Sequence, residues 1–146
     1  GAAAPQAVAT VVSLINDGFY NATSCHRLTT GDMAVVQCGD PLGFGFGGPG
    51  YTFGPVENAP ADDLYPAGTL AMARAAADGE SMGSQFFIVY EDSVIPSDIA
   101  GGYTVIGQVS SPLDAFIEEF VTPGTVDGSP DGQPFADIVI DSITIR

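Results

Sequence analysis

Basic residues are scarce in this sequence. It has no lysine, and its three arginines (Arg27, Arg74 and Arg146) oppose eighteen carboxylates, which gives a net charge of −15 at pH 7. Proteins bind nucleic acid through lysine and arginine side chains that neutralise phosphates, and anionic membranes attract the same side chains. The composition therefore argues against nucleic acid as a partner and against membrane contact by this domain itself.

Long apolar runs are also missing. The stretch 70–77 is interrupted by Arg74, and no run approaches the roughly 18 residues that a membrane-spanning helix needs. We therefore expect a soluble chain. Its 146 residues predict one domain, residues 1–146, and an apolar content of 45% is enough for a packed core.

Histidine and cysteine are too few for two common kinds of site. A G-x-S-x-G match at residues 79–83 would need a histidine base after Ser81, but the only histidine, His26, lies before it. A serine hydrolase is therefore a remote alternative. Two cysteines, Cys25 and Cys38, with one histidine do not reproduce the paired spacing of zinc ligands, so we predict no metal site.

A glycine-rich stretch at residues 43–48 formally fits G-x-G-x-x-G. That fingerprint binds a pyrophosphate at the start of a helix, whereas here Pro49-Gly50 follows. The stretch therefore predicts a flexible turn rather than a nucleotide site.

Nineteen glycines and eleven prolines predict short strands separated by turns. An apolar stripe predicts a helix from near Pro5 to Gly18, and Ser111 as cap with Pro112 at the first position predicts a second. The segments with strand character are residues 24–29, 34–38, 69–73, 85–90, 103–109 and 137–145. The expected fold is mainly β: a closed or nearly closed antiparallel barrel with two helices capping it.

Three segments carry a more specific pattern. They are His26-Arg27 followed by residues 37–40 (QCGD), then residues 47–51 (GGPGY), then residues 82–88 (MGSQFFI). The order and the residues of these segments resemble the cyclophilin family of peptidyl-prolyl isomerases, and further matches extend over essentially the whole chain. The motifs are most similar to those of exported or membrane-anchored cyclophilins of high-GC Gram-positive bacteria. This similarity predicts an exported protein or one held at the extracellular face of the membrane by an anchor outside this chain, with a cytoplasmic protein as the alternative.

The resemblance implies an enzyme that accelerates rotation about Xaa-Pro bonds in peptides and unfolded client proteins, with no cofactor. Arg27 would hydrogen-bond the prolyl nitrogen as the bond twists, and Gln37 and Gln85 would anchor the substrate backbone. Phe87 would form the pocket for the proline ring. The resemblance adds Val35, Ile99 and Tyr103 as pocket walls, and Ala73, Arg74 and Ala75 as the lining of the substrate strand. His26 is interpreted as a buried, hydrogen-bonded structural residue.

Several positions depart from the family pattern. Asp98 lies where cyclosporin-sensitive members commonly have tryptophan, so cyclosporin is expected to bind only weakly. Residues 32–34 (DMA) replace a usual aromatic and methionine, which predicts a shallower pocket, and Phe44 and Phe46 replace small polar residues. A shallow pocket keeps a second function open, namely a non-catalytic module that binds proline peptides or acts as a chaperone.

The chain also starts at about the first helix, where cyclophilins have a preceding two-stranded hairpin. The final run, residues 137–145, has apolar residues at both odd and even positions, which predicts a strand whose two faces are both buried. The hairpin that pairs with this strand in cyclophilins is absent from the sequence. An unpaired apolar edge recruits other strands, so we expect self-association or low stability.

Cys25 and Cys38 lie at the far ends of two strand-like runs joined by a turn. Antiparallel pairing of the runs would bring the two thiols close together. A disulfide between them would suit an exported protein, whereas in the cytosol both would stay reduced. Two buried apolar cysteines remain the alternative.

Overall fold

The computed structural model describes residues 1–145, so Arg146 lies outside the described residues. Its elements, in chain order, are α1 (Pro5–Asn16), β1 (Thr23–Ser24), β2 (Arg27–Thr30), β3 (Ala34–Cys38), β4 (Leu64–Tyr65), β5 (Thr69–Met72), β6 (Phe86–Val89), β7 (Ser93–Val94), β8 (Val105–Gln108), α2 (Asp114–Phe116) with a π-helical continuation η1 (Ile117–Val121), β9 (Asp131–Gly132) and β10 (Val139–Ile140).

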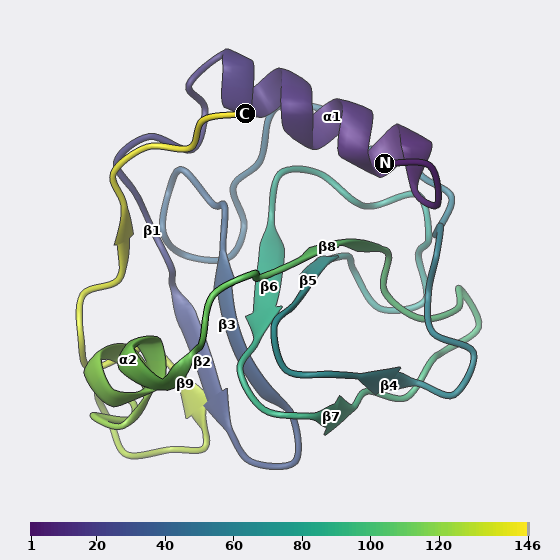
Figure 1. The fold of residues 1–146 in the computed structure, drawn as a ribbon. Helices are drawn as coiled ribbons and strands as arrows, with labels where there is room; N and C mark the ends of the chain where they lie inside the picture. Colours follow the sequence, from purple (N-terminus) through teal and green to yellow (C-terminus); the bar gives the residue numbers. More distant parts are fainter. Residues whose placement is uncertain (146) are drawn as a thin grey trace.

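Six antiparallel strands form one sheet in the order β8-β5-β6-β3-β2-β9, and the pairs β1–β10 and β4–β7 form two small sheets. The large sheet curves strongly, with β4 and β7 at one end of it (Figure 1). Within residues 1–145, no strand pairing joins β8 to β9. The architecture is therefore a nearly closed barrel that is mainly β, as the sequence predicts.

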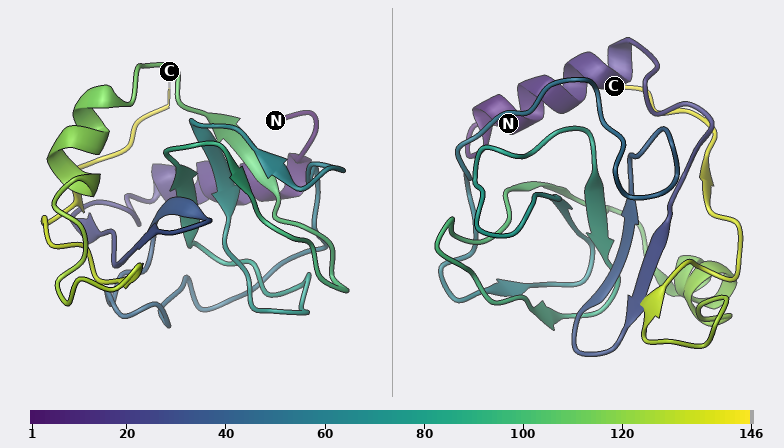
Figure 2. Two further views of the ribbon diagram at one scale, coloured as in Figure 1. Left: turned by 90° about the horizontal axis from the view of Figure 1, so that it is seen from below. Right: turned by 180° about the vertical axis from the view of Figure 1, so that it is seen from behind.

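Helix α1 lies across one side of the sheet, and α2 lies near the edge strand β9 (Figure 2). Proline at its first turn suits the start of α1, and the N–H groups of Gln6 and Ala7 donate to the Glu57 carboxylate at 3.3 and 3.0 Å. A carboxylate at this end of a helix satisfies free N–H groups and matches the helix dipole. Glu57, about 50 residues away in sequence, therefore fastens the helix to the barrel.

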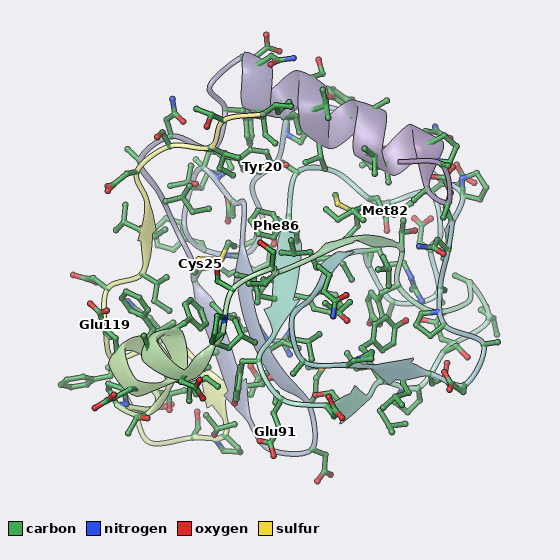
Figure 3. The ribbon with its side chains drawn as sticks, viewed as in Figure 1. Tyr20, Cys25, Met82, Phe86, Glu91 and Glu119 are labelled. Carbon is green, nitrogen blue, oxygen red and sulfur yellow. A yellow bond between two sulfur atoms is a disulfide. The ribbon has the colours of Figure 1, made fainter. Side chains whose placement is uncertain are left out.

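The alternation of side chains along the strands produces two apolar layers. Tyr20, Met82 and Phe86 belong to the layer between the sheet and α1 (Figure 3). Phe87, one residue beyond Phe86, belongs to a second cluster with Val35 on the opposite face of the sheet. That second face also carries the polar residues described below.

The second helix starts later than the sequence predicts. It begins at Asp114, and the position before it, Leu113, makes no side-chain cap. A capping side chain reaches N–H groups only two or three residues ahead, so Ser111 lies too far back to cap this helix. The predicted apolar face does pack, partly buried, against the main core; its members are Leu113, Phe116, Ile117 and Phe120.

The prediction of a long C-terminal strand is wrong. Only Val139–Ile140 forms a strand, and it pairs with β1 rather than remaining unpaired. Its partner has only two residues, which limits the length of the ladder. Ile138 is buried whereas Val139 is 51% exposed, so the run is buried on one side only. Self-association through this segment stays a prediction.

Candidate active site

Strand register aligns the predicted catalytic residues in one row. Arg27 on β2 pairs with Gln37 on β3, and Gln37 pairs with Phe87 on β6. Residues opposite each other on neighbouring strands project from the same face of a sheet. Side chains 10 and 50 residues apart in sequence therefore lie beside one another on the face away from α1.

A chain of hydrogen bonds connects this row to its surroundings. Asp131 on β9 accepts from Arg27 Nε and Nη2, both at 2.7 Å, and Arg27 Nη1 donates to Gln37 Oε1 at 3.1 Å. Gln37 Nε2 donates to Gln85 Oε1 at 2.8 Å. Gln85 Nε2 in turn donates to the carbonyls of Gly45 and Gly47 at 3.0 and 2.9 Å. The guanidinium is thus held in a fixed orientation on a partly exposed surface.

The Arg27–Asp131 pair is the strongest electrostatic feature of the row. The hydrogen bond to Asp131 raises the pKa of Arg27, and the bond from Arg27 lowers the pKa of Asp131. The Arg27 side chain is 36% exposed, so solvent reaches the guanidinium beside its carboxylate partner. Because an arginine guanidinium does not deprotonate in proteins, Arg27 remains positively charged.

An aromatic cluster adjoins the row. Phe87 meets Tyr103 edge-on with ring centres 5.4 Å apart, and both pack on the buried Tyr65. Val35 is buried in the same cluster, and Met33 and Ala73 pack against it partly buried. Ile99, predicted as a third wall, is instead 92% exposed and lies outside this cluster. Met33, which the family resemblance does not assign to the pocket, packs against the cluster.

Arg74 is a buried cation at the edge of the groove described below. Its side chain is 1% exposed, and it donates to both carboxylate oxygens of Asp98 at 3.0 and 2.9 Å. Its guanidinium also stacks 4.8 Å from the centre of the Tyr103 ring. The hydrogen bonds from Arg74, followed by those from backbone N–H groups of Ala77 and Ala100, hold the pKa of Asp98 well below its usual range.

A groove of about 820 Å³ runs beside the row on the Gln85 side. It is lined by residues 45–52 and by the residues predicted to line the substrate strand, Ala73, Arg74 and Ala75. Gln37 and Gln85 form part of its floor, whereas Phe87 and Tyr103 do not line it. The structure therefore brings the predicted polar anchors and the predicted substrate strand to one open groove.

The glycine-rich loop on this groove is organised around Asp40. The carboxylate is fully buried and accepts hydrogen bonds from the N–H groups of Leu42, Phe44, Gly45 and Phe46 at 2.6 to 3.1 Å. Burial alone would raise the pKa of Asp40, but the backbone hydrogen bonds outweigh burial and lower it. The N–H groups of the loop therefore bind the Asp40 carboxylate, whereas a nucleotide-binding loop would bind a phosphate with such groups. The prediction of a flexible turn is wrong, because these hydrogen bonds fix the loop backbone.

Two sequence interpretations concern side chains near this loop. The prediction that His26 is hydrogen-bonded is wrong: both ring nitrogens are buried without a partner among the described residues. Burial lowers the pKa of His26, and the charge of Arg27 adds to this effect although the charge of Asp40 opposes it.

The serine of the G-x-S-x-G match has no histidine partner in the described part of the chain. Ser81 Oγ donates to the Asp78 carbonyl at 2.7 Å. No serine–histidine pair forms, so the hydrolase alternative has no structural support.

Cys25 and Cys38 are joined by a disulfide at the start of the β2–β3 hairpin. Both cysteines are buried in the main core. The bond links the residue two positions before Arg27 to the residue directly after Gln37, so it braces the strands that carry both.

Asp131 is the functional candidate that the sequence did not reveal. It lies in the turn-rich stretch 123–134, 104 residues from Arg27, and no local spacing connects the two. Only the pairing of β2 with β9, in which Thr29 opposes Asp131, brings its carboxylate to the guanidinium.

Comparison with known proteins agrees with this geometry. The family model described as cyclophilin type peptidyl-prolyl cis-trans isomerase/CLD matches residues 1–145. The chain belongs to the cyclophilin family. A protein of Mycobacterium tuberculosis named probable peptidyl-prolyl cis-trans isomerase B is 41% identical over 152 residues, covering 97% of this chain and 47% of the relative. The chain thus spans about half the length of this relative, and likewise half that of a Mycobacterium leprae protein of the same name.

Two other matches extend the comparison. Peptidyl-prolyl cis-trans isomerase B of Bacillus subtilis is 43% identical over 112 residues, covering 77% of this chain and 73% of the relative. The crystal structure of a Cryptosporidium parvum cyclophilin type peptidyl-prolyl cis-trans isomerase, in the presence of the dipeptide Ala-Pro, superposes with a TM-score of 0.79 at 28% identity. That match covers 99% of this chain and 87% of the other.

Proposed function

We propose that this chain is a peptidyl-prolyl cis-trans isomerase in which Arg27 stabilises the twisted Xaa-Pro bond. The observation that carries the proposal is the row of Arg27, Gln37 and Phe87 across three neighbouring strands, with Arg27 fixed by Asp131. Family membership and the Ala-Pro dipeptide named with the Cryptosporidium structure support a proline-containing substrate.

The chemistry follows from the electronic structure of the amide. An Xaa-Pro bond rotates over a barrier of about 18 to 20 kcal/mol because the nitrogen donates its lone pair into the carbonyl. Twisting the bond returns the lone pair to the nitrogen. A donor beside that nitrogen therefore binds the transition state more strongly than the planar ground state, and this difference accelerates rotation.

Arg27 has the donors that this role requires. Arginine carries five N–H groups. Two of those in Arg27 bond Asp131 and one bonds Gln37, which leaves two for a substrate. The neighbouring apolar cluster, which includes Phe87, Tyr103 and Met33, offers apolar surface for the proline ring. No covalent intermediate is needed, because rotation breaks no σ bond.

We propose different roles for the two glutamines that the resemblance implies as substrate anchors. Both N–H groups of the Gln85 amide already donate to loop carbonyls, whereas Gln37 has one N–H left. We therefore assign substrate anchoring to Gln37, and assign to Gln85 the positioning of Gln37 and of the loop.

The role of Asp131 gives a direct prediction. We expect Asp131→Ala to lower kcat/KM for an Xaa-Pro peptide about fivefold, because the guanidinium loses two of its three hydrogen bonds and its orientation. Asp131→Asn, which keeps one acceptor, should retain more activity than Asp131→Ala. The NMR signal of the Arg27 Nε–H reports the orientation directly and should broaden or shift in both variants.

A purely structural role for Asp131 would give a different pattern. In that case both variants would lose thermal stability while kcat/KM and the Arg27 Nε–H signal stayed at their wild-type values. Asp127→Asn is the matched control, since Asp127 lies in the same loop but accepts hydrogen bonds from Ser129 and Thr125 rather than from Arg27. This control should keep wild-type kcat/KM.

Cyclosporin is expected to bind weakly. Asp98 has no N–H to donate, and its carboxylate is already engaged by Arg74 and by the N–H groups of Ala77 and Ala100. An apolar ligand placed there would desolvate this ion pair without replacing its hydrogen bonds. Titration calorimetry should give a dissociation constant in the micromolar range or weaker, and nanomolar binding would contradict the prediction.

The disulfide supports a proposal on location. Disulfides persist in oxidising compartments and are rare in the bacterial cytosol, so a Cys25–Cys38 bond suits an exported protein. Thiol counting on denatured, non-reduced protein taken from its native compartment should find no reactive thiol. Two reactive thiols would contradict both the bond and the export.

A further inference from the structure

The loop that follows β3 in Figure 1 carries four large apolar side chains that are exposed. Leu42, Phe44, Phe46 and Tyr51 are 63%, 78%, 92% and 50% exposed. These four residues, here called the loop rim, belong to the eleven large apolar side chains that are exposed among residues 1–145. Scattered exposed apolar residues are ordinary, but four of them on one short loop favour an interaction surface.

The backbone beneath the loop rim is fastened from inside. The buried Asp40 carboxylate bonds the N–H groups of Leu42, Phe44 and Phe46 themselves. A Cβ atom at Gly47 would lie 1.8 Å from Asp40 Oδ1, so only glycine allows this close approach. The rim side chains therefore project from a preorganised backbone, which lowers the entropy lost on binding.

The loop rim is continuous with the candidate active site. Leu42, Phe46 and Tyr51 line the same groove as Gln37 and Gln85. Gln85 also bonds the carbonyls of Gly45 and Gly47, so one side chain joins the row of Arg27 to the rim loop. A polypeptide extended through the groove would meet the rim within a few residues of its proline.

Charge indicates which polypeptides this surface favours. The two arginines at the site are paired, Arg27 with Asp131 and Arg74 with Asp98, and the whole chain has a net charge of −15. Long-range attraction therefore acts on positively charged segments and weakens as salt screens it.

We propose that the loop rim is an accessory binding surface for unfolded client segments in which large apolar or aromatic residues flank the Xaa-Pro bond, with segments of net positive charge preferred. The inference rests on the proposed isomerase function, whose substrate class it narrows. The rim gives affinity through apolar burial beside the reacting bond, and the glycine loop holds it in place.

Matched peptides test the proposal. One peptide carries a central Ala-Pro with phenylalanine and leucine two to four residues away on both sides, and the other carries serine at those positions. We expect wild-type kcat/KM to be about tenfold higher for the apolar peptide. Adding a lysine to each end should raise kcat/KM further at low salt but not at high salt.

Two variants locate the effect. In Phe44→Ser/Phe46→Ser the ratio between the two peptides should fall toward one, whereas Phe135→Ser, which removes a 68% exposed aromatic side chain elsewhere, should leave the ratio unchanged. Equal wild-type rates for both peptides would overturn the inference and leave the isomerase proposal intact. No acceleration of either peptide would instead refute the isomerase proposal.

Sedimentation velocity tests whether the loop rim instead binds a second copy of this chain. If the wild-type protein dimerises and Phe44→Ser/Phe46→Ser is monomeric, the loop rim binds a second copy of this chain and the inference is overturned. The inference predicts that the sedimentation coefficients of the two forms agree.

Discussion

Arg27→Ala is expected to lower kcat/KM for a short Xaa-Pro peptide at least tenfold, which corresponds to about 1.4 kcal/mol of lost transition-state stabilisation. The variant removes the charged donor group that the row offers to a twisted prolyl nitrogen. Gln37 keeps its bond to Gln85, so the groove should stay formed. Isomerisation rates with matched thermal melts measure both effects.

Arg27→Lys is the informative companion to this variant. Lysine keeps the positive charge but cannot bond Asp131 through two atoms and Gln37 through a third. We expect it to lose most of the activity as well. A folded Arg27→Ala protein with wild-type rates would remove Arg27 from the mechanism, and full activity in Arg27→Lys would show that charge alone suffices.

Asp40→Asn is expected to destabilise the protein by about 3 kcal/mol and to lower Tm by about 8 °C. The carboxylate is fully buried and receives four backbone N–H groups. An amide of the same size offers one oxygen, and its own NH2 group would face these donors. Because the loop also holds Gln85, isomerase activity should fall together with stability.

The pH dependence of this variant follows from the pKa of Asp40. Because the folded pKa is lowered, the carboxylate stabilises the fold fully above its unfolded pKa of about 4 and loses this effect as pH falls through the folded pKa. The stability difference between wild type and Asp40→Asn should therefore be constant near neutral pH and shrink in acid.

Asp32→Asn is the matched control for Asp40→Asn, since Asp32 is an exposed aspartate on the β2–β3 turn. Its melting temperature should stay within about 2 °C of wild type at all pH values. If Asp40→Asn also melts like wild type, the carboxylate does not organise the loop.

Much of the site could be predicted because its residues lie on strands with clear patterns. The runs around Arg27, Gln37 and Phe87 have strand character, and their resemblance to the cyclophilin family places them at one site. The strand Ala34–Cys38 has the predicted bounds. Neighbouring strands then place these side chains in one row through register alone.

Other features depend on contacts that no local pattern encodes. Asp131 meets Arg27 through a two-residue strand within a turn-rich stretch. Ile99 is exposed and follows Asp98, which bonds Arg74, 24 residues earlier, and no local pattern indicates that pairing. The C-terminal run has the composition of a long strand, but its partner β1 is only two residues long.

The most direct test of the central claim is exchange NMR on an Ala-Pro peptide with catalytic amounts of the purified wild-type chain. The claim predicts cis–trans exchange far faster than the uncatalysed process, which takes tens to hundreds of seconds, and a return toward the uncatalysed rate with Arg27→Ala. A non-catalytic proline-binding module would instead shift the peptide resonances on binding without accelerating exchange. That result would contradict the isomerase proposal.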